Sequence, residues 1–527
     1  MNIKALTSQL TEEEKTPLVL QLLEIIQLQA EQIQNLKDEI ARLKGQTPKP
    51  NIKPSKLEKG SKPKSKNKRK KRPGSKKRHK TKHLQIHDEK VIPPDKIPSG
   101  SKFKGYQDYV VQDIKFEPFN IRYRLARWQG PNGEYIIGKL PQELMGSHFG
   151  TTLRSFILYQ YYHAHVTQPL LWEQLSEIGI EISSGEISRI ISEGKERFHN
   201  EKEEILKIGL QVSKYINVDD TGARHNGKNG YCTHIGNEIF ACFESTESKS
   251  RINFLKILRA GNEDYIINTD AIFYMEEQKL PRKEFIKFSN LLNTAYSNEQ
   301  LWQEKLTDLN ITMPRHIQIA TEGALLGSVL EHGFNEKMVI VSDDAGQFNI
   351  LQHSLCWIHA ERTINKLVGF NDNQRQALEQ TRSNIWEFYK RLKEYKLNPG
   401  DAEKQRLRMR FDEIFLEKTC FATLNQALKR LYRNKTELLL VLERPEIPLH
   451  NNLSENDIRE YVKRRKISGS SRSSPGRRCR DTFTSLKKTC RKHKISFWHY
   501  LQDRLRSGNM VPNLPDLISV RAAEFFV

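Results

Sequence analysis

Two pairs of adjacent aspartates each follow a short apolar run in this chain of 527 residues. Asp219 and Asp220 stand near the end of the run YINVDDTG, and Asp343 and Asp344 stand near the end of VIVSDDAG. An unpaired carboxylate is costly in a protein interior, so each pair is expected at the C-terminal edge of a strand, where a positive group can meet it. A third acid, Glu455, falls in the first turns of a predicted helix.

Acids carried by two strands and one helix can converge on a single point if the two strands are neighbours. Carboxylates that repel one another need compensating charge, and hard divalent ions such as Mg²⁺ or Mn²⁺ supply it. Two such ions roughly 4 Å apart would activate an attacking oxygen and stabilise the leaving oxygen in a phosphodiester. The alternative is that the pairs are surface carboxylates at strand ends. Asp270, after the strand-like run YIINT, is a rival second acid.

The elements that must position these acids are predicted from periodicity. The segments KYINVDD, GYCTHIGN and EIFACFEST predict an antiparallel meander, with a helix at 251–258 after it. KMVIVSDDAG predicts one further buried strand, and the chain around it is mostly helical at about 260–335 and 364–442. We therefore predict an α/β catalytic domain at residues 211–470 with two helical insertions.

The charge of the chain points to nucleic acid as the partner. The formal net charge is +22, and residues 49–82 hold 17 Lys or Arg against one acid, Glu58. Residues 46–95 are predicted to be a disordered basic tether that binds phosphate without reading sequence. The densest basic run is Lys68, Arg69, Lys70, Lys71 and Arg72.

Other compositional features narrow the class of protein. The sequence holds no apolar run of the roughly 18 residues that would span a bilayer, so we expect no membrane partner and a soluble, intracellular protein. Six cysteines without a Cys-x-x-Cys pair argue against a disulfide framework and a thiolate zinc site. His353, Cys356 and His359 have ligand-like spacing, but a packed helix start is the favoured interpretation.

A helix is predicted within the segment 1–45. The spacing of Thr11 and Glu14 is that of a capping box, which marks the start of a helix. Its apolar residues repeat by heptads, with Gln29 as the polar interruption. One register holds Val19, Ile26, Ile33 and Ile40, and the other holds Leu22, Leu36 and Leu43. The pattern predicts a coiled coil and a homodimer or higher oligomer; the alternative is an amphipathic helix that docks on its own chain.

Three further segments are predicted to contact DNA or to support that contact. Residues 96–150 predict a small β-rich unit with hairpin turns, and residues 151–210 predict a helix-turn-helix, which is either a DNA reader or an ordinary helical hairpin. Residues 471–527 form a basic C-terminal segment. On the helix that carries Glu455, the predicted phosphate contacts are Arg459, Lys463, Arg464, Arg465 and Lys466, although a solvated basic face is the alternative.

Three blocks of this sequence resemble the signature blocks of the insertion-sequence 66 family of bacterial transposases. They are INVDDTGARHNGKNGYCTHIGN, VIVSDDAGQFNILQHSLCWIHAER and LHNNLSENDIREYVKRRKISGSSRS. The resemblance implies a ribonuclease-H-like core with an Asp-Asp-Glu triad. The family pattern places the catalytic, metal-binding acids at Asp219, Asp343 and Glu455, and it favours Asp343 over Asp270. The cysteine cluster that the family usually carries near its N-terminus is absent here, so no zinc is expected there.

The resulting hypothesis is a Mg²⁺- or Mn²⁺-dependent transposase that cuts DNA at transposon ends and joins them to target DNA, with accessory proteins as candidate partners. One alternative is a catalytically inactive DNA-binding repressor derived from a transposase. Another is a nuclease that does not transfer strands.

Overall fold

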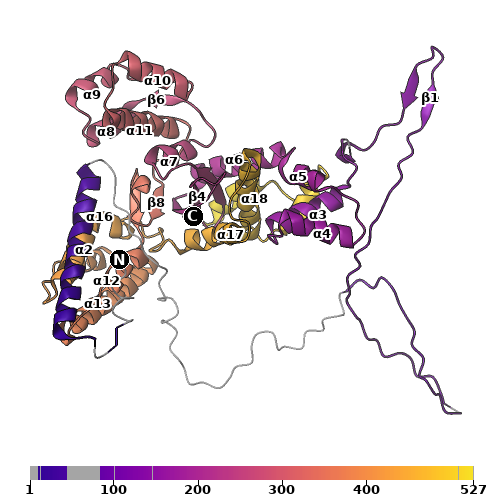
Figure 1. The fold of residues 1–527 in the computed structure, drawn as a ribbon, viewed down its shortest axis with the longest axis horizontal. Helices are drawn as coiled ribbons and strands as arrows, with labels where there is room; N and C mark the ends of the chain where they lie inside the picture. Colours follow the sequence, from indigo (N-terminus) through magenta and orange to yellow (C-terminus); the bar gives the residue numbers. More distant parts are fainter. Residues whose placement is uncertain are drawn as a thin grey trace.

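A computed structural model describes residues 10–11, 14–43, 84–99, 101–144, 146–508 and 510–525. Most of the predicted basic tether, including the run from Lys68 to Arg72, lies outside these ranges. The described residues form a mixed α/β protein, as predicted, with a central sheet and many helices (Figure 1). None of the described helices is long and apolar enough to cross a membrane.

The central sheet has five strands in the order β5-β4-β3-β8-β9. β3 (Tyr215–Gly222), β4 (Tyr231–Gly236) and β5 (Ala241–Thr246) form an antiparallel meander. β8 (Val339–Ser342) lies parallel to β3 on its other side, and β9 (Gln352–Leu355) lies parallel to β8. The predicted meander and the predicted buried strand are therefore confirmed, and β9 is an addition that the sequence did not predict.

Helix α18 (Ser474–Lys492) covers the outer edge of the sheet. Three N–H groups of edge strand β5 donate to side chains four residues apart on α18. They join Ala241 to Thr489 Oγ1 (3.2 Å), Phe243 to Ser485 Oγ (2.9 Å) and Ser245 to Asp481 Oδ2 (2.9 Å). An uncovered edge would be free to pair with another chain, and α18 prevents this. The helix lies beyond residue 470, where the catalytic domain was predicted to end.

Two helical insertions flank the strands of the sheet (Figure 1). α7 follows β5 at Arg251–Leu258, as predicted. The first insertion then contains α8 (Thr269–Glu277), α9 (Arg282–Ser289), α10 (Glu299–Asp308), α11 (Pro314–Glu331) and the small sheet of β6 (Tyr265–Ile267) and β7 (Thr294–Tyr296). The second contains α12 (Trp357–Asn365), α13 (Asp372–Leu397), α14 (Asp401–Phe415), α15 (Ala422–Tyr432) and α16 (Lys435–Leu438).

The N-terminal helix α2 (Pro17–Leu43) docks on the second insertion of its own chain. Gln27 Nε2 donates to the carbonyl of Val368 (2.9 Å), and Glu31 pairs with Arg430 (3.2 Å). The Thr11 N–H donates to Glu14, as a capping box requires, but the helix begins only at Pro17. Docking on the same chain was the alternative to a coiled coil, and it uses only one face of the helix.

Residues 84–150 form an extended and largely exposed arm (Figure 1). Its regular structure is the hairpin of β1 (Arg127–Gln129) and β2 (Tyr135–Ile137) and the short turn η2 (Gln142–Leu144). The arm leads into a helical layer that packs beside α18. This layer contains α3 (Thr151–Tyr162), α4 (Gln168–Glu177), α5 (Ser184–Ser192) and α6 (Glu196–Val212), with α19 (Phe497–Leu505) and α20 (Leu514–Phe525) packed on it.

Within residues 151–210, where a helix-turn-helix was predicted, α4 and α5 are two consecutive short helices. Leu171 and Leu175 of α4 are buried, as are Ile187 and Ile190 of α5. Ser183 accepts a hydrogen bond from the Glu186 N–H (3.1 Å), so it caps α5.

Candidate active site

The register of the sheet places Asp219 level with Asp343. Asn217 of β3 is the partner of Val341 in the parallel neighbour β8. Asp219 lies two residues further along β3, and Asp343 lies two residues beyond Val341, directly after the end of β8. Since side chains alternate with a period of two, the two carboxylates are on the same face and at the same height. The second aspartates, Asp220 and Asp344, fall one step out of this alignment.

Glu455 is carried by α17 (Asn452–Ser468), and Asn451 fixes the start of this helix to β3. The Asn451 side chain is fully buried. Its Nδ2 donates to the carbonyl of Val218 (2.7 Å), the residue before Asp219, and its Oδ1 accepts from Asn217 Nδ2 (2.9 Å). This pair of bonds ties the first turn of α17 to the strand that holds the first acid.

Asn451 is the N-cap of α17 by position, but its side chain makes no capping bond. Its backbone N–H donates to Cys356 Sγ (3.2 Å), at the start of α12. A buried asparagine that bridges two chain segments has no periodic signature, so the sequence gives no signal for this role.

Buried polar contacts also fix α17 to strand β4 and to helix α18. His234, the partner of Asp219 across β3 and β4, has its Nδ1 2.6 Å from Ser454 Oγ, and its Nε2 lies 3.3 Å from Asp457 Oδ2. Asp457 also pairs with Lys488 (3.2 Å) and Lys492 (2.9 Å) of α18. These contacts set the rotation of α17 and therefore the direction in which Glu455 points.

The electrostatics of the site indicate that the acids are close neighbours. Burial is the largest cause that raises the pKa of Asp219 well above its usual range, and the carboxylates of Asp343, Asp220 and Glu455 add to the rise. Burial also raises the pKa of Asp343 to about 6; Asp220 and Glu455 contribute to this rise, and Lys249 opposes it. Burial and neighbouring carboxylates thus disfavour the anionic forms of Asp219 and Asp343, which is the condition that a bound cation relieves.

The donor set fits a hard divalent ion. Asp343 Oδ1 is buried and has no hydrogen-bond partner, so one anionic oxygen at the site is unsatisfied. Carboxylate oxygens are the ligands that Mg²⁺ takes from proteins. As the side chains lie, no three His, Cys, Asp or Glu residues in the described part of the chain are grouped closely enough to hold an ion. Glu455 is turned toward Arg362 and His359 instead.

Asp220 has its own partners beside the site. Its Oδ1 accepts from Thr233 Oγ1 (2.6 Å) and its Oδ2 accepts from Gln347 Nε2 (2.6 Å). Lys249 lies 3.9 Å from the same oxygen. These contacts hold the Asp220 carboxylate in a network that Asp219 does not share.

Asp270 lies apart from the central sheet. It is exposed in the first turn of α8, next to the two-stranded sheet of β6 and β7. The strand-like run before it is therefore real, but it belongs to the first helical insertion.

The predicted basic residues of α17 divide into two groups. Arg459, Lys463 and Lys466 are exposed. Arg464 is buried, and it donates to the carbonyl of Tyr161 (2.9 Å) while stacking on its ring. Arg465 donates to the carbonyl of Gly222, at the end of β3. Arg464 and Arg465 therefore position α17.

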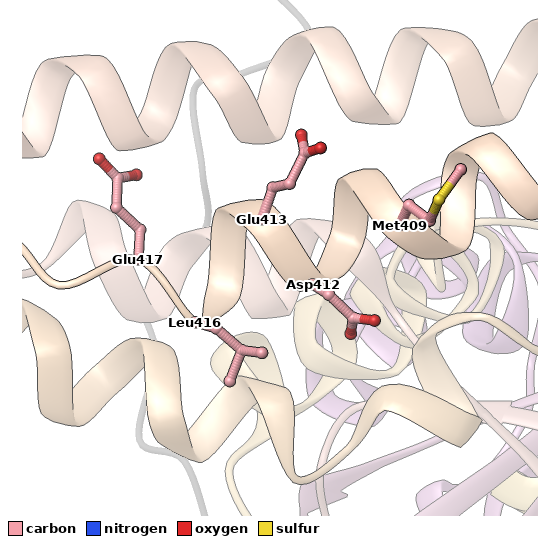
Figure 2. Close-up of a pocket in the computed structure, with 5 residues that line it drawn as sticks. All are labelled: Met409, Asp412, Glu413, Leu416 and Glu417. Atoms are coloured by element: carbon pink, nitrogen blue, oxygen red, sulfur yellow. The ribbon is translucent and has the colours of Figure 1, made fainter.

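A surface depression lies on the second insertion, away from these acids. It is lined by Met409, Asp412, Glu413, Leu416 and Glu417. Figure 2 shows Glu413 and Glu417 pointing to one side of α14 and Asp412 and Leu416 pointing to the other. None of the predicted site residues lines it.

The raised pKa of Asp343 predicts a pH dependence of metal binding. An ion must displace the proton of Asp343 and any proton on Asp219, so Mn²⁺ affinity is expected to rise by about tenfold or more per pH unit below about pH 6 and less steeply above it. Calorimetric titration between pH 5 and 8 measures this, and Asp343→Asn should bind weakly with a flatter profile. A flat profile for the intact chain would contradict the assignment of Asp343 as a ligand.

The raised pKa of Asp343 also makes the stability of the metal-free protein depend on pH, and the stability that Asp343 contributes falls as the pH rises. The folded-state pKa lies above the unfolded value, so the contribution of Asp343 to stability is fully present below the unfolded pKa and is lost as pH rises through about 6.

Comparison with known proteins identifies the family. Residues 323–478, which include β8, Asp343, α12 and Glu455, match the family model described as Transposase IS66 family. The chain is also 41% identical over 321 residues to the uncharacterized protein y4jO of Sinorhizobium fredii (strain NBRC 101917 / NGR234), an alignment that spans 60% of this chain and 100% of that relative. The chain belongs to the IS66 family of transposases.

Proposed function

We propose that the protein is a DNA transposase that cleaves phosphodiester bonds at the ends of an insertion sequence and joins the freed ends to target DNA. Membership of the IS66 family supports a transposase. The observation that carries the assignment of Asp219, Asp343 and Glu455 as catalytic acids is the shared register of the two aspartates, with Glu455 tied to the same strand through Asn451. The order of three antiparallel and two parallel strands supports a ribonuclease-H-like core.

The three acids would act as fixed negative charges that hold the divalent ions. Bound Mg²⁺ or Mn²⁺ would supply polarisation of the attacking and leaving oxygens. Asp219 and Asp343 present their carboxylates from the rigid sheet, and Glu455 presents its carboxylate from α17. Water cleaves the bond at the element's end and frees a 3′-hydroxyl, which then attacks target DNA. No side chain becomes attached to DNA, unlike in recombinases that use a serine or tyrosine nucleophile.

DNA would follow the exposed basic face of α17. Glu455, Arg459, Lys463 and Lys466 recur at helical spacing, so the three cations continue the side of the helix that carries the acid. The loop after α17 is bound to the β3–β4 turn, because the Asn226 N–H donates to the Ser471 carbonyl (2.9 Å). Cations in this position bind phosphates without reading bases. The pair α4 and α5 would act as a helix-turn-helix that reads the terminal repeats.

The outer face of α2 is proposed to pair two copies of the chain. Ile33, Leu36 and Ile40 of the predicted heptads are 52%, 60% and 49% exposed, while the inner face of α2 docks on the same chain. Replacing Ile33 and Leu36 with lysine should convert a dimer into a monomer, measured by light scattering, because charge cannot enter an apolar seam. Replacing Phe273 and Leu397, which are exposed on α8 and α13, in the same way should leave the dimer intact. A dimer that survives the first change would exclude this interface.

A nicking and joining assay tests the proposed function. The purified chain is mixed with DNA that carries an end of the element, with Mg²⁺ or with EDTA. We expect a nick that leaves a 3′-hydroxyl and, with target DNA, joined products, both only with Mg²⁺. Binding without nicking would support an inactive repressor instead, and nicking without joined products would indicate a nuclease.

A further inference from the structure

Glu455 is held by Arg362 of α12, and His359 of the same helix lies beside this ion pair. Arg362 Nη1 donates to Glu455 Oε1 at 3.2 Å, and His359 Nε2 lies 3.6 Å from the same oxygen. Arg362 Nη1 and His359 Nε2 are themselves 2.9 Å apart. The Arg362 side chain is only 7% exposed, so the guanidinium is placed by the protein interior and its position is not a chance surface contact.

Hydrogen bonds fix the start of α12, the helix that carries Arg362 and His359. The Trp357 N–H donates to the Leu449 carbonyl (3.0 Å), and Trp357 Nε1 donates to the Leu438 carbonyl (2.9 Å). Cys356, just before α12, accepts from the Asn451 N–H that also starts α17. The first turns of α12 and α17 therefore share one anchor, and the distance between Arg362 and Glu455 follows from it.

Several polar atoms at this place have no partner. Arg362 Nε, His359 Nδ1 and Asp343 Oδ1 are all buried and make no hydrogen bond. A buried polar atom without a partner destabilises a protein, so such atoms accumulate where a ligand completes the bonding. Two of these atoms are nitrogens that suit an anionic oxygen, and the third is an oxygen that suits a cation. The unpaired atoms therefore suit one cation and one anionic oxygen side by side.

We propose that Arg362 and His359 form a phosphate-binding pair beside the catalytic acids. In the DNA-free protein Arg362 holds Glu455, and His359 Nε2 accepts a hydrogen bond from the same guanidinium. When a divalent ion takes that carboxylate, the Arg362 guanidinium turns to a phosphate of the bound strand. This inference rests on the proposed function, because it requires a metal and a DNA strand at the acids. Arginine suits the role, since its fork of N–H groups matches two phosphate oxygens and keeps its charge at every relevant pH.

The pair competes with the ion for Glu455, and this gives a test that does not depend on activity. In the full chain without DNA, Arg362→Gln should bind Mn²⁺ about threefold to tenfold more tightly, measured by calorimetry, because the carboxylate is no longer engaged by a cation. The same variant should bind end-containing DNA more weakly in Ca²⁺ and should nick it about 10²-fold more slowly at saturating DNA and Mn²⁺. His359→Gln should shift each quantity in the same direction by less.

Two further variants keep the result interpretable. Arg382, which pairs with Glu361 at 2.9 Å between α12 and α13, is the matched control, and Arg382→Gln should leave Mn²⁺ affinity and nicking unchanged. Arg362→Lys keeps the charge; it should fold, bind Mn²⁺ as the intact chain does, and nick slowly because the fork is lost. If Arg362→Gln does not fold, the Mn²⁺ affinity and the nicking rate of Arg362→Lys test the inference instead.

Three outcomes would overturn the inference. The first is unchanged Mn²⁺ affinity and nicking in Arg362→Gln, with an active intact chain; this removes the phosphate-binding pair and leaves the proposed function standing. The second is a loss of Mn²⁺ affinity in Arg362→Gln as large as in Glu455→Gln, which would make Arg362 a packing residue only. The third is an intact chain that neither binds Mn²⁺ nor nicks DNA, and this would remove the proposed function as well.

Discussion

Asp219→Asn is expected to lower Mg²⁺-dependent nicking by about 10³-fold or more, the scale on which loss of a charge-stabilising group acts at an active site. Asparagine has the size of aspartate but no charge, so the sheet should be undisturbed while a buried anionic ligand is lost. Because burial and the neighbouring carboxylates of Asp343, Asp220 and Glu455 disfavour the ionised form of Asp219, the metal-free variant should also unfold at a higher temperature than the intact chain at neutral pH. Nicking of end-containing DNA and thermal unfolding without metal are the two measurements.

Asp270→Asn is the control for this experiment. Asp270 is an exposed carboxylate in the first turn of α8, outside the five-stranded sheet, and its replacement should leave nicking within about twofold, as surface substitutions usually do. If Asp270→Asn abolished nicking and Asp343→Asn did not, the second acid would have to be reassigned.

Asn451→Ala is expected to cause the second largest loss, although Asn451 is not expected to touch the substrate. The change removes the bonds to the Val218 carbonyl and to Asn217 and leaves these buried groups unpaired, at a cost of about 1–3 kcal/mol of stability. Without that tie, the first turn of α17 can shift against β3. Displacement of Glu455 by about 1 Å is enough to lower nicking by about 10²-fold.

Measuring nicking at several temperatures distinguishes a loss of stability in Asn451→Ala from a displacement of Glu455. Nicking by Asn451→Ala should stay low at temperatures well below its unfolding midpoint, where the variant is folded. Asn373→Ala, at an exposed position of α13, should change neither stability nor nicking measurably. If nicking by Asn451→Ala recovered fully once the protein was folded, Asn451 would be a stability residue only.

Much of the central sheet could be predicted because local patterns specify it. The three strands of the meander, the strand before Asp343 and the helix at 251–258 all carry periodicity that depends on a few neighbouring residues. β9 was missed because its four residues, Gln352–Leu355, alternate too briefly to stand out from the loop around them. Helix α18 was predicted only as a basic segment, since its buried polar face looks solvated until β5 supplies the N–H donors.

The sequence predicted the acids of the candidate site, but it did not predict the residues that position them. Carboxylates after apolar runs are visible in the sequence because burying them is costly, and that cost implies a cation. Asn451, His234 and Arg362 have no such signal. Each is a common residue type whose function depends on a partner from a distant part of the chain.

The sequence by itself determined which residues can carry charge at the site and which class of partner the chain prefers. Acid pairs, a basic excess and strand periodicity are local or additive properties, so they can be read without a fold. Only the tertiary structure decided that Asp219 and Asp343 lie level in adjacent parallel strands, that Asn451 ties Glu455 to them, and that Arg362 holds this glutamate. These relations join segments that lie 93 or more residues apart in the chain, and their geometry depends on packing that no local pattern encodes.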